Sequence, residues 1–425
     1  MPTVEGAELR KSKNNSSAMR IGLYGAVSTA SEMRPIIKSP LNKFKGFCAR
    51  VIDVVNWRLT GRARLHFYHW NRFDGTNKGD TAIRETIKDS VTRVFTPSPV
   101  EFVELEWGEL ASIDIEEANR NWDALIIGGS GYIQTGFQGD LAPRLLADLE
   151  VLTRLNIPKI LYGVGWNTLM SKHQQIPQVT ESAKQSIRQL LSAVDLLSVR
   201  DESSAKLLQE LSDKPVYLTS DPALFSAMKQ GYRDIKRSPD RLQVGLNFAL
   251  HGPQAAARFE QKFDAYCDIL RAIENRYSVN FHHVPHSDTE RVVPAMFRAR
   301  GIRMEAHNPA PAQLIALYKQ LDIHISEMMH SSILAIGAGT PTLNMAYDIK
   351  NVGFYDLLGL SHLCHPIWSL DTERFLQSID YAIKESEKIK TSIETRKSQL
   401  GAAQSEFLEK FSERVRGRRA CSQSS

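Results

Sequence analysis

Short apolar runs alternate with amphipathic stretches over most of the chain. Ala124 to Ile127, Lys159 to Tyr162 and Leu196 to Val199 have the length and apolar character of buried strands, and glycines follow the first two. Stretches with helical periodicity, at about 140 to 155 and 178 to 193, separate these runs. Alternation of strand and helix is typical of a parallel, doubly wound sheet.

The same alternation starts again in the second half of the chain. Residues 225 to 241 are polar and turn-rich, which is typical of a linker, and we place a domain boundary near residue 232. The later elements that the pattern predicts are strands at 244–248, 279–284, 302–305 and 323–326, helices at about 253–275, 289–299 and 311–320, a compact loop at 344–360, and long charged helices within 371–418.

We therefore expect an α/β protein in which two Rossmann-like, doubly wound parallel-sheet domains face a central cleft at the carboxyl ends of their strands. The expected units are a basic N-terminal elaboration (1–60), a first domain (61–232), a second domain (233–370), and C-terminal helices with a basic tail (371–425). Within the first two units the pattern predicts short strands at 20–25 and 65–70, a helix at 41–57 and a helix from Thr81.

Composition narrows the class of protein. No apolar run approaches the roughly 18 residues that a transmembrane helix needs, and the first residues lack the apolar centre of a signal peptide, so we expect a cytoplasmic protein. Residues 1–72 hold thirteen Lys and Arg against four Asp and Glu, in a chain whose net charge is +5. Such a basic segment suits anionic lipid headgroups or a phosphorylated ligand, with an ordinary solvated surface as the alternative. It carries no helix-turn-helix, zinc-finger or RNA-recognition signature, so we expect no nucleic acid partner.

The loop Asn71 to Asp80 joins a predicted strand to a predicted helix. Asn77, Gly79 and Asp80 would then lie at a helix N-terminus, where backbone N–H groups attract anions. Asp is also a preferred N-cap residue, so Asp80 has a purely structural alternative.

Two glycine-rich turns, 127–132 (IGGSGY) and 162–167 (YGVGWN), follow predicted strands. Glycines there let a ligand approach the backbone, which makes Ser130, Tyr132 and Asn167 candidate binding residues. Trp166 could stack on the face of a sugar, and packing in the core is the alternative for this indole.

Three basic or titratable residues follow strands that should end at the cleft. Arg200 can make paired hydrogen bonds to a carboxylate or a phosphate, with a salt bridge to Asp201 or another acid as the alternative. His330 begins a helix after a strand and titrates in the range of a general base. Lys350 follows the next strand and should reach the same edge.

The sequence His282-His283-Val-Pro-His286 invites interpretation as a metal site. Strand alternation sends His282 and His283 to opposite faces, and no acid lies at a metalloprotease spacing, so we predict no metal. His286 and Ser331 instead become candidate polar residues of the cleft, and we expect no cofactor.

In this order the motifs resemble those of the polysaccharide pyruvyl transferase family. The matching segments are Asn77-Lys-Gly79-Asp80, Gly128-Gly-Ser130, Gly163-Val-Gly165, Val199-Arg-Asp-Glu-Ser-Ser204, Asp221-Pro222, Met328-Met-His330, Gly339-Thr-Pro341 and Tyr347-Asp-Ile-Lys350. The sequence departs from the family pattern at Met328, where the family usually has arginine, and at Ser130, where it usually has glycine.

The resemblance implies a glycosyltransferase-B-like (GT-B-like) fold and transfer of pyruvate from phosphoenolpyruvate to a sugar as a ketal, without a metal. The acceptor, a saccharide that is free or lipid-linked, would bind the first domain at Ser130, Tyr132, Trp166 and Asn167. The donor would bind the second domain and its surroundings, at Asn77, Gly79, Asp80, Arg200, His286, Ser331 and Lys350. His330 would be the catalytic base, with Arg200 stabilising charge.

Two alternatives remain open at the level of sequence. The same architecture serves glycosyltransferases that use nucleotide-sugar donors, because a fold does not fix the donor. The absence of arginine at position 328 also allows a non-catalytic sugar-binding subunit of a polysaccharide-producing complex. The basic N-terminal region additionally suggests peripheral contact with the inner face of a membrane.

Overall fold

The computed structural model describes residues 19–24, 77–105, 109–136, 138–168, 176–228, 230–238 and 240–423. The strand expected at 65–70, the helix expected at 41–57 and the first part of the loop 71–80 lie outside the described residues. So does most of the basic N-terminal segment.

Within the described residues, the first sheet has six strands in the order β2-β1-β3-β5-β7-β8, all of them parallel. Its strands are β1 (Met19–Tyr24), β2 (Val100–Leu105), β3 (Ala124–Gly128), β5 (Lys159–Val164), β7 (Leu196–Val199) and β8 (Val216–Leu218). Strand β1 lies between β2 and β3, so part of the segment that we expected to precede the first domain contributes a strand to its sheet.

Helices connect the strands of this sheet, as the alternation of the sequence predicts. They are α3 (Lys78–Phe95), α4 (Ile115–Asn121), α5 (Pro143–Arg154), α6 (Glu181–Ala193) and α7 (Glu202–Gln209), with the 3₁₀ turns η2 (Glu109–Ser112) and η3 (Pro222–Phe225) and a small sheet of β4 (Ile133–Gln134) and β6 (Trp166–Asn167). Helix α3 begins three residues earlier than expected, because Asn77 rather than Asp80 is its N-cap.

The second sheet, counted over the described residues, also has six parallel strands, in the order β11-β10-β9-β12-β13-β14. Its elements are β9 (Leu242–Asn247), α8 (Pro253–Arg276), β10 (Val279–His283), η4 (Asp288–Val292), α9 (Val293–Arg298), β11 (Glu305–Ala306), η5 (Pro311–Gln313), α10 (Leu314–Tyr318), β12 (Ile323–Ser326), α11 (Met329–Gly337), β13 (Thr342–Ala346), α12 (Ile349–Leu357), η6 (Ser361–Leu363), β14 (Cys364–Pro366) and η7 (Ile367–Ser369). The strand order reverses between β9 and β12, the position at which such sheets bind ligands.

The prediction of a compact loop at 344–360 is wrong. This segment completes β13 and then forms helix α12, which Asp348 caps by accepting a hydrogen bond from Lys350 N. Most of its residues are buried, among them Ile349, Phe354 and Leu357, so this helix is buried on most sides. The helix follows β13 without a turn signal, and this hid the boundary from the pattern.

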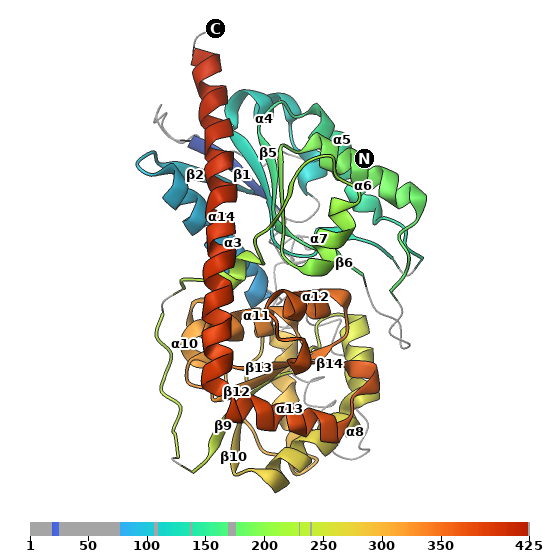
Figure 1. Ribbon diagram of the computed structural model, residues 1–425, viewed down its shortest axis with the longest axis vertical. Coiled ribbons are helices and arrows are strands. Elements are labelled where there is room, and N and C mark those ends of the chain that lie inside the picture. The colour runs from blue at the N-terminus through green and yellow to red at the C-terminus, as the bar shows by residue number, and fades with distance from the viewer. Residues whose placement is uncertain are drawn as a thin grey trace, which may run out of the picture.

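The chain ends in two helices, α13 (Thr372–Lys384) and α14 (Ser386–Gln423). Figure 1 shows α14 running along both halves of the molecule, from the second sheet back to the first. Phe407 stacks on Tyr162 with ring centroids 5.6 Å apart, and Phe411 meets Phe95 edge to face. The C-terminal helix therefore joins the two domains, which confirms the expected architecture of two facing Rossmann-like domains with a long C-terminal helix.

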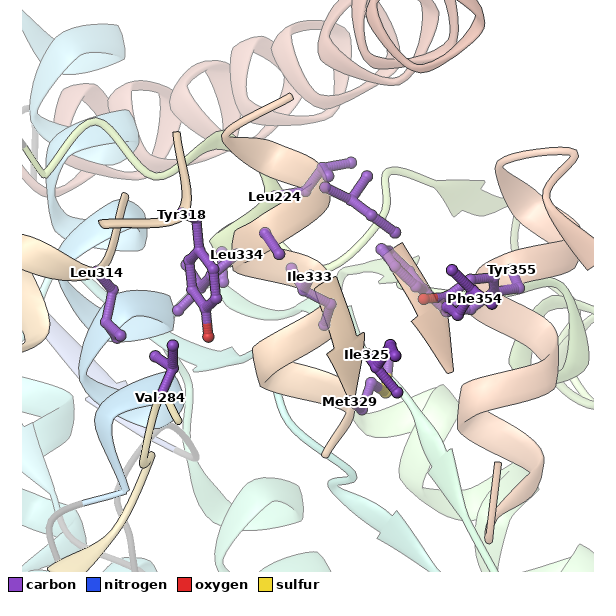
Figure 2. Close-up of a cluster of buried hydrophobic side chains, with 14 of the residues drawn as sticks. Leu224, Val284, Leu314, Tyr318, Ile325, Met329, Ile333, Leu334, Phe354 and Tyr355 are labelled. Atoms are coloured by element: carbon purple, nitrogen blue, oxygen red, sulfur yellow. The ribbon is translucent and has the colours of Figure 1, made fainter. Parts of the chain in front are cut away.

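One continuous hydrophobic core surrounds helix α11 and includes residues of both halves, among them Ile83 of α3. Figure 2 shows Ile333 and Leu334 of α11 among the apolar side chains of neighbouring elements, with Leu224 of η3 close by. This packing fixes the start of α11, where His330 lies. Among the described residues, no helix is long and apolar enough to cross a bilayer.

Candidate active site

A cleft of about 280 Å³ lies between the two domains. The first domain contributes the start of α3, the turn after β3, strand β6 and the residue after β7. The second domain contributes helix α8, the segment that follows β9, and the starts of α11 and α12. The residues that line the cleft include Asn77, Asp80, Ser130, Asn167, Arg200, His251, Arg258, Met328, His330, Tyr347 and Lys350. The carboxyl ends of both sheets meet here, as expected for doubly wound domains.

His330 and Asp80 face each other across the cleft. Nε2 of His330 lies 3.8 Å from Oδ1 of Asp80. The approach depends on Gly79, because a Cβ added there would lie 2.3 Å from the Cβ of His330. The glycine of the Asn-x-Gly-Asp motif is thus explained by close packing between the domains.

The start of α3 is held against the second domain by its own backbone and by Lys78. The Lys78 N–H donates to the carbonyl of His286 at 3.1 Å, and Nζ of Lys78 donates to the carbonyl of Pro285 at 2.9 Å. Asn77 caps the helix by accepting a hydrogen bond from the Gly79 N–H. These contacts position Asp80 opposite His330.

Burial sets the protonation of this pair. It lowers the pKa of His330 to about 3, and the nearby charges of Arg200 and Lys350 act in the same direction. It raises the pKa of Asp80 to about 7, with repulsion from Asp221 adding to the effect. At neutral pH the imidazole is therefore neutral, and the carboxyl group of Asp80 is present in both its protonated and its ionised form.

Arg200 is almost fully buried and combines the two roles considered for it. Its Nε donates to Asp201 at 3.3 Å and its Nη1 lies 3.7 Å from Asp221, while its Nη2 is buried without a hydrogen-bond partner. Gly165 leaves room for this side chain, since a Cβ there would lie 2.2 Å from Nε. Because Arg200 also lines the cleft, the unpaired Nη2 is a donor available to an anion.

Lys350 connects the two sides of the cleft. Its Nζ lies 3.3 Å from Oδ2 of Asp348 and donates to Oδ1 of Asn167, across the domain boundary, at 3.3 Å. Burial opposes its charge, but Asp348 and Tyr347 outweigh this and raise the pKa of Lys350. The ammonium group therefore stays charged at neutral pH.

Helix α11 points its N-terminus into the same cleft. Its N-cap is Met328, whose side chain makes no capping hydrogen bond. An uncapped helix N-terminus attracts negative charge through its backbone N–H groups and the helix dipole. Together with Arg200 and Lys350, this makes the cleft suitable for an anion.

Sequence reasoning missed Arg258, a further cation of the cleft. Its Nε donates to Oε1 of buried Glu327 at 2.5 Å, and its guanidinium carbon lies 4.0 Å from the centre of the Tyr347 ring. Arg258 lies inside α8 without a local motif. Glu327 could have indicated a cation here, because it is a charged residue directly after the buried strand β12 and a buried charge requires a partner in the fold.

A family model described as polysaccharide pyruvyl transferase matches residues 45–349 of the 425. The chain belongs to the polysaccharide pyruvyl transferase family. This confirms the resemblance carried by the ordered motifs, most of which end at the cleft. No curated protein matches the chain.

Several solved structures are similar in fold to this pyruvyl transferase family member. A UDP-N-acetylglucosamine 2-epimerase matches at 12% identity, covering 93% of this chain and 95% of that one, with a TM-score of 0.47. A putative UDP-N-acetylglucosamine 2-epimerase from Listeria monocytogenes matches at 12% identity, with 89% and 90% coverage and a TM-score of 0.45. A mutant of the Thermobaculum terrenum O-GlcNAc transferase matches at 13% identity, with 96% and 69% coverage and a TM-score of 0.43. Such similarity says nothing about the substrate of this chain.

The geometry explains one departure from the family pattern. Ser130 adopts a φ of 58°, in the left-handed region that favours glycine, as does Gly129 before it with a φ of 65°. The turn of this pyruvyl transferase family member therefore retains the backbone that a glycine would adopt. Its Ser130 carbonyl accepts a hydrogen bond from the Gly165 N–H, which ties the two glycine-rich turns together.

Five candidate residues from the sequence lie away from the cleft lining: Gly79, which packs against His330, and four residues whose side chains turn inward. Trp166 is buried and donates Nε1–H to Thr135 at 2.9 Å, which is the core-packing alternative. Tyr132 is buried and donates to Asp148. His286 and Ser331 both bind the hydroxyl of buried Tyr318, at 2.7 and 2.8 Å. In each case the side chain hydrogen-bonds to a partner inside the fold and turns inward rather than toward a ligand, although Nδ1 of His286 has no hydrogen-bond partner.

Proposed function

We propose that this protein transfers pyruvate from phosphoenolpyruvate to a sugar of a surface polysaccharide, or of its lipid-linked precursor, and forms a cyclic ketal. Membership of the pyruvyl transferase family supports the reaction class. The observation that carries the proposal is the convergence of three cations, Arg200, Arg258 and Lys350, on a cleft that also holds the neutral imidazole of His330.

Phosphoenolpyruvate has two anionic groups, and the cleft offers complementary groups from both domains. Arg200 and Lys350 would hold its carboxylate and phosphate, with Arg258 as the third cation near them. The uncapped start of α11 would add backbone donors. Asn77 and Gly79 would act through the start of α3, where they position Asp80 rather than touch the donor themselves.

The reaction requires a proton to be added at the donor and another to be removed from the acceptor. Protonation of the methylene carbon of the enol leaves positive charge at the central carbon, to which the first sugar hydroxyl adds. The carbon–phosphate oxygen bond then breaks, inorganic phosphate leaves, and the second hydroxyl closes the ring. The methyl group takes one of the two hydroxyl protons in the net reaction, and phosphate takes the other.

His330 and Asp80 are the groups that would move these protons. Neutral His330 would take the proton of the attacking hydroxyl, and protonated Asp80 would supply the proton to the methylene carbon. Part of the lowering of the His330 pKa comes from Arg200 and Lys350. A bound anion would neutralise these charges and so raise the pKa of the imidazole toward the range of a general base.

The acceptor would bind on the first-domain side of the cleft, near Ser130 and Asn167. Ser130 follows β3, Asn167 lies in β6, and both line the cleft. A lipid-linked acceptor would bring the protein to the inner face of a membrane, and the basic segment within residues 1–60 would favour anionic headgroups there.

The decisive experiment is donor consumption by the purified full chain. Phosphoenolpyruvate and a panel of nucleotide sugars are titrated calorimetrically without acceptor, and phosphate release is then followed with candidate saccharides. We expect phosphoenolpyruvate to bind without acceptor. We expect phosphate to be released only when the acceptor is present. Binding of a nucleotide sugar with release of nucleotide would replace the proposal with a glycosyltransferase. Binding of saccharide without consumption of either donor would indicate a non-catalytic subunit.

A further inference from the structure

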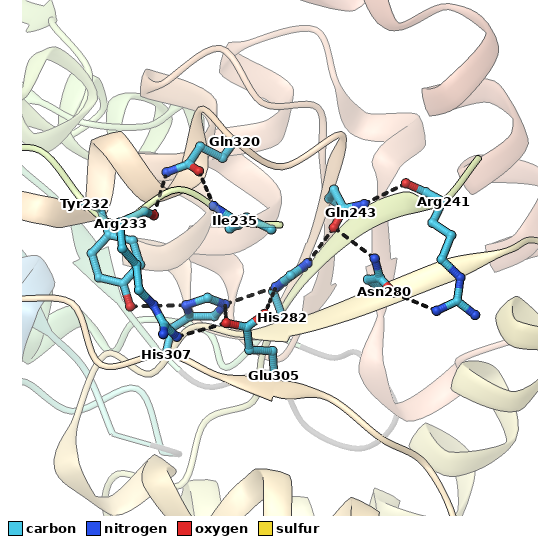
Figure 3. A network of polar contacts seen from close by, with 10 residues as sticks. All are labelled: Tyr232, Arg233, Ile235, Arg241, Gln243, Asn280, His282, Glu305, His307 and Gln320. Carbon is cyan, nitrogen blue, oxygen red and sulfur yellow. Dashed lines mark hydrogen bonds and ion pairs between the residues drawn. The ribbon is translucent and has the colours of Figure 1, made fainter. Parts of the chain in front are cut away.

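A second cluster of polar residues lies outside the cleft, on the β11 edge of the second sheet. It consists of His282 on β10, Glu305 on β11 and His307 just after β11 (Figure 3). Nδ1 of His282 lies 3.0 Å from Nε2 of His307. The Glu305 carboxylate lies 3.6 Å from the first of these nitrogen atoms and 3.9 Å from the second.

The parallel register explains why these side chains meet. His282 and Glu305 are paired across β10 and β11, and His307 follows Glu305 by two residues, so all three share one face of the sheet. His283 points to the opposite face, as the sequence predicted. The partner of His282 is therefore the Glu-Ala-His segment of the neighbouring strand, and not the histidines beside it in sequence.

The surroundings fix which nitrogen of His282 carries its proton. Gln243 donates its Nε2–H to the carbonyl of Arg241, so its Oε1 faces His282 and can only accept. Nε2 of His282 must then be the donor, at 2.9 Å, which leaves the lone pair of Nδ1 directed at the cluster. A second partner of the Gln243 oxygen, the Asn280 amide at 3.3 Å, supports the same orientation.

His307 is held in a comparable way. Its Nδ1 lies 3.1 Å from the hydroxyl of Tyr232, which can donate a hydrogen bond to that nitrogen or accept one from it. In one tautomer Nε2–H of His307 donates to Nδ1 of His282 at 3.0 Å; in the other, Nδ1–H donates to Tyr232 and the lone pair of Nε2 is directed at the cluster. Burial lowers the pKa of His282 to about 4 and that of His307 to about 4. A neutral imidazole presents a lone pair, and this is the form that ligates metals.

We propose that His282, Glu305 and His307 bind one divalent transition metal ion of the zinc class. Ligand atoms around tetrahedral zinc are separated by roughly 3.3 Å when metal–ligand bonds are about 2.0–2.1 Å long. The two nitrogen atoms are 3.0 Å apart and Oε2 of Glu305 lies 3.6 Å from Nδ1 of His282, close to this value. One ligand atom from each of the three residues lies within 4.8 Å of the other two, so side-chain movements suffice to complete the set. Two imidazoles and one carboxylate are a common donor set for zinc.

The remaining groups fit such an ion. Gln243 and Tyr232 hold the outer nitrogen atoms of the two rings, as second partners of metal-bound histidines commonly do. Arg233 binds Oε1 of Glu305 at 2.9 Å, which leaves Oε2 for the metal. Glu305 is 45% exposed, so a water molecule can reach the fourth position.

The position of the site indicates a structural role. Tyr232 and Arg233 belong to the polar segment that connects the two sheets, and both contact the cluster. A metal ion would order His307 and Glu305, and through them would hold this segment against the edge of the second sheet. This role is independent of the donor cleft.

The test measures zinc binding to the full chain produced without a histidine tag. The protein is treated with a chelator, dialysed, and titrated with zinc while metal content is measured by mass spectrometry and thermal unfolding is recorded. We expect one zinc ion per chain and a rise in the unfolding temperature. Glu305→Gln should lose the ion while the fold persists, because this side chain is half exposed.

Two further variants separate a real site from incidental binding by histidines. His362→Gln removes an exposed histidine elsewhere in the second domain and should leave zinc binding unchanged. Tyr232→Phe should weaken binding about 10- to 100-fold, because it removes only the hydrogen bond that orients His307. Substoichiometric zinc, or equal binding by wild type and Glu305→Gln, would show that the cluster is only a hydrogen-bonded network and would overturn the proposal.

Discussion

The guanidinium group of Arg258 is paired with the carboxylate of Glu327 beside the cleft. Glu327 directly precedes Met328, the position at which the family usually has arginine. Nε of Arg258 uses one edge of the guanidinium for this pair, and the ring of Tyr347 covers one face of it. Arg258 and Met328 both line the cleft. A cation from α8 is thus present in the region where the expected arginine of the motif is absent.

We expect Arg258 to contribute to donor binding, and the test must avoid leaving Glu327 as an unpaired buried charge. Removal of one partner of a buried pair typically costs about 3–5 kcal/mol of stability, so Arg258→Gln alone is ambiguous. The double variant Arg258→Gln/Glu327→Gln removes both charges. Its dissociation constant for phosphoenolpyruvate should rise about tenfold or more, since hydrogen bonds to charged groups contribute about 1.5–3 kcal/mol. An unchanged constant in a folded double variant would make the pair purely structural.

Met328→Arg tests whether a cation at this place binds the donor, by adding a cation rather than removing one. In the wild-type chain we expect it to tighten phosphoenolpyruvate binding or leave it unchanged, because Arg258 already supplies a cation. In the Arg258→Gln/Glu327→Gln background it should recover part of the lost affinity, because the new guanidinium begins from the N-cap of α11, which faces the cleft. Calorimetry with phosphoenolpyruvate measures both. Failure to recover any affinity in the double-variant background would contradict compensation between the two positions.

His330→Gln should abolish turnover while leaving donor affinity within a few-fold of wild type. A general base typically contributes about 10²- to 10⁴-fold to the rate and little to ground-state binding. Glutamine keeps much of the side-chain volume against Gly79, so the packing between the domains should survive. Phosphate release and calorimetric affinity are measured on the same preparation, and unaltered turnover would remove His330 from the mechanism.

Local pattern predicted much of the fold. The run Ala124–Gly128 is apolar and ends in glycine, and Ile323–Ser326 is a short buried strand in which His324 and Ser326 alternate with two isoleucines; both positions could be predicted from the sequence. Helix α12 was missed because β13 passes directly into it. Strand β1 was expected, but its place between β2 and β3 depends on pairing with strands that come much later in the chain.

The sequence predicted a site residue correctly where the place of that residue after a strand is enough to bring its side chain to the cleft. Arg200, His330 and Lys350 reach the cleft because they follow β7, β12 and β13, and Asp80 reaches it from the first turn of α3. Trp166 and Tyr132 follow strands equally closely but turn inward, because Thr135 and Asp148 offer buried partners that no local motif reveals. Arg258 comes from inside a helix, and only the assembled tertiary structure brings it to the cleft.

Phe407→Ala should destabilise the whole chain, because this residue of the C-terminal helix packs on the first domain. Phe407 is fully buried and contacts the rings of Tyr162 and Tyr217. Truncation of a buried phenylalanine costs about 3–5 kcal/mol of unfolding free energy. The control is Glu409→Ala, at an exposed position of the same helix, which should change stability by less than about 0.5 kcal/mol. Equal unfolding curves for the two variants in denaturant would show that α14 does not hold the domains together.

The pH dependence of the reaction should report Asp80. Its pKa of about 7 arises mainly from burial, which together with repulsion from Asp221 outweighs the opposing charges of Lys350, Arg200 and Arg84. If its protonated form supplies the proton to the donor, kcat/KM is high below pH 7 and falls as the pH rises through that value. A bound anionic donor would raise the pKa further, so the fall in kcat should occur at higher pH than the fall in kcat/KM.

Asp80→Asn separates this role from a structural one, because the two roles predict opposite changes. The pKa of an unfolded Asp is about 4, so the folded state takes up a proton between about pH 4 and 7, and this group makes stability fall as the pH rises across that window. Asparagine cannot ionise, and the variant should therefore be at least as stable as wild type at pH 8, while its turnover falls steeply and the residual turnover lacks the alkaline fall. Titration of the phosphoenolpyruvate phosphate affects both proteins equally and cancels in the comparison. A variant that retains turnover with the same alkaline fall would assign that fall to another group.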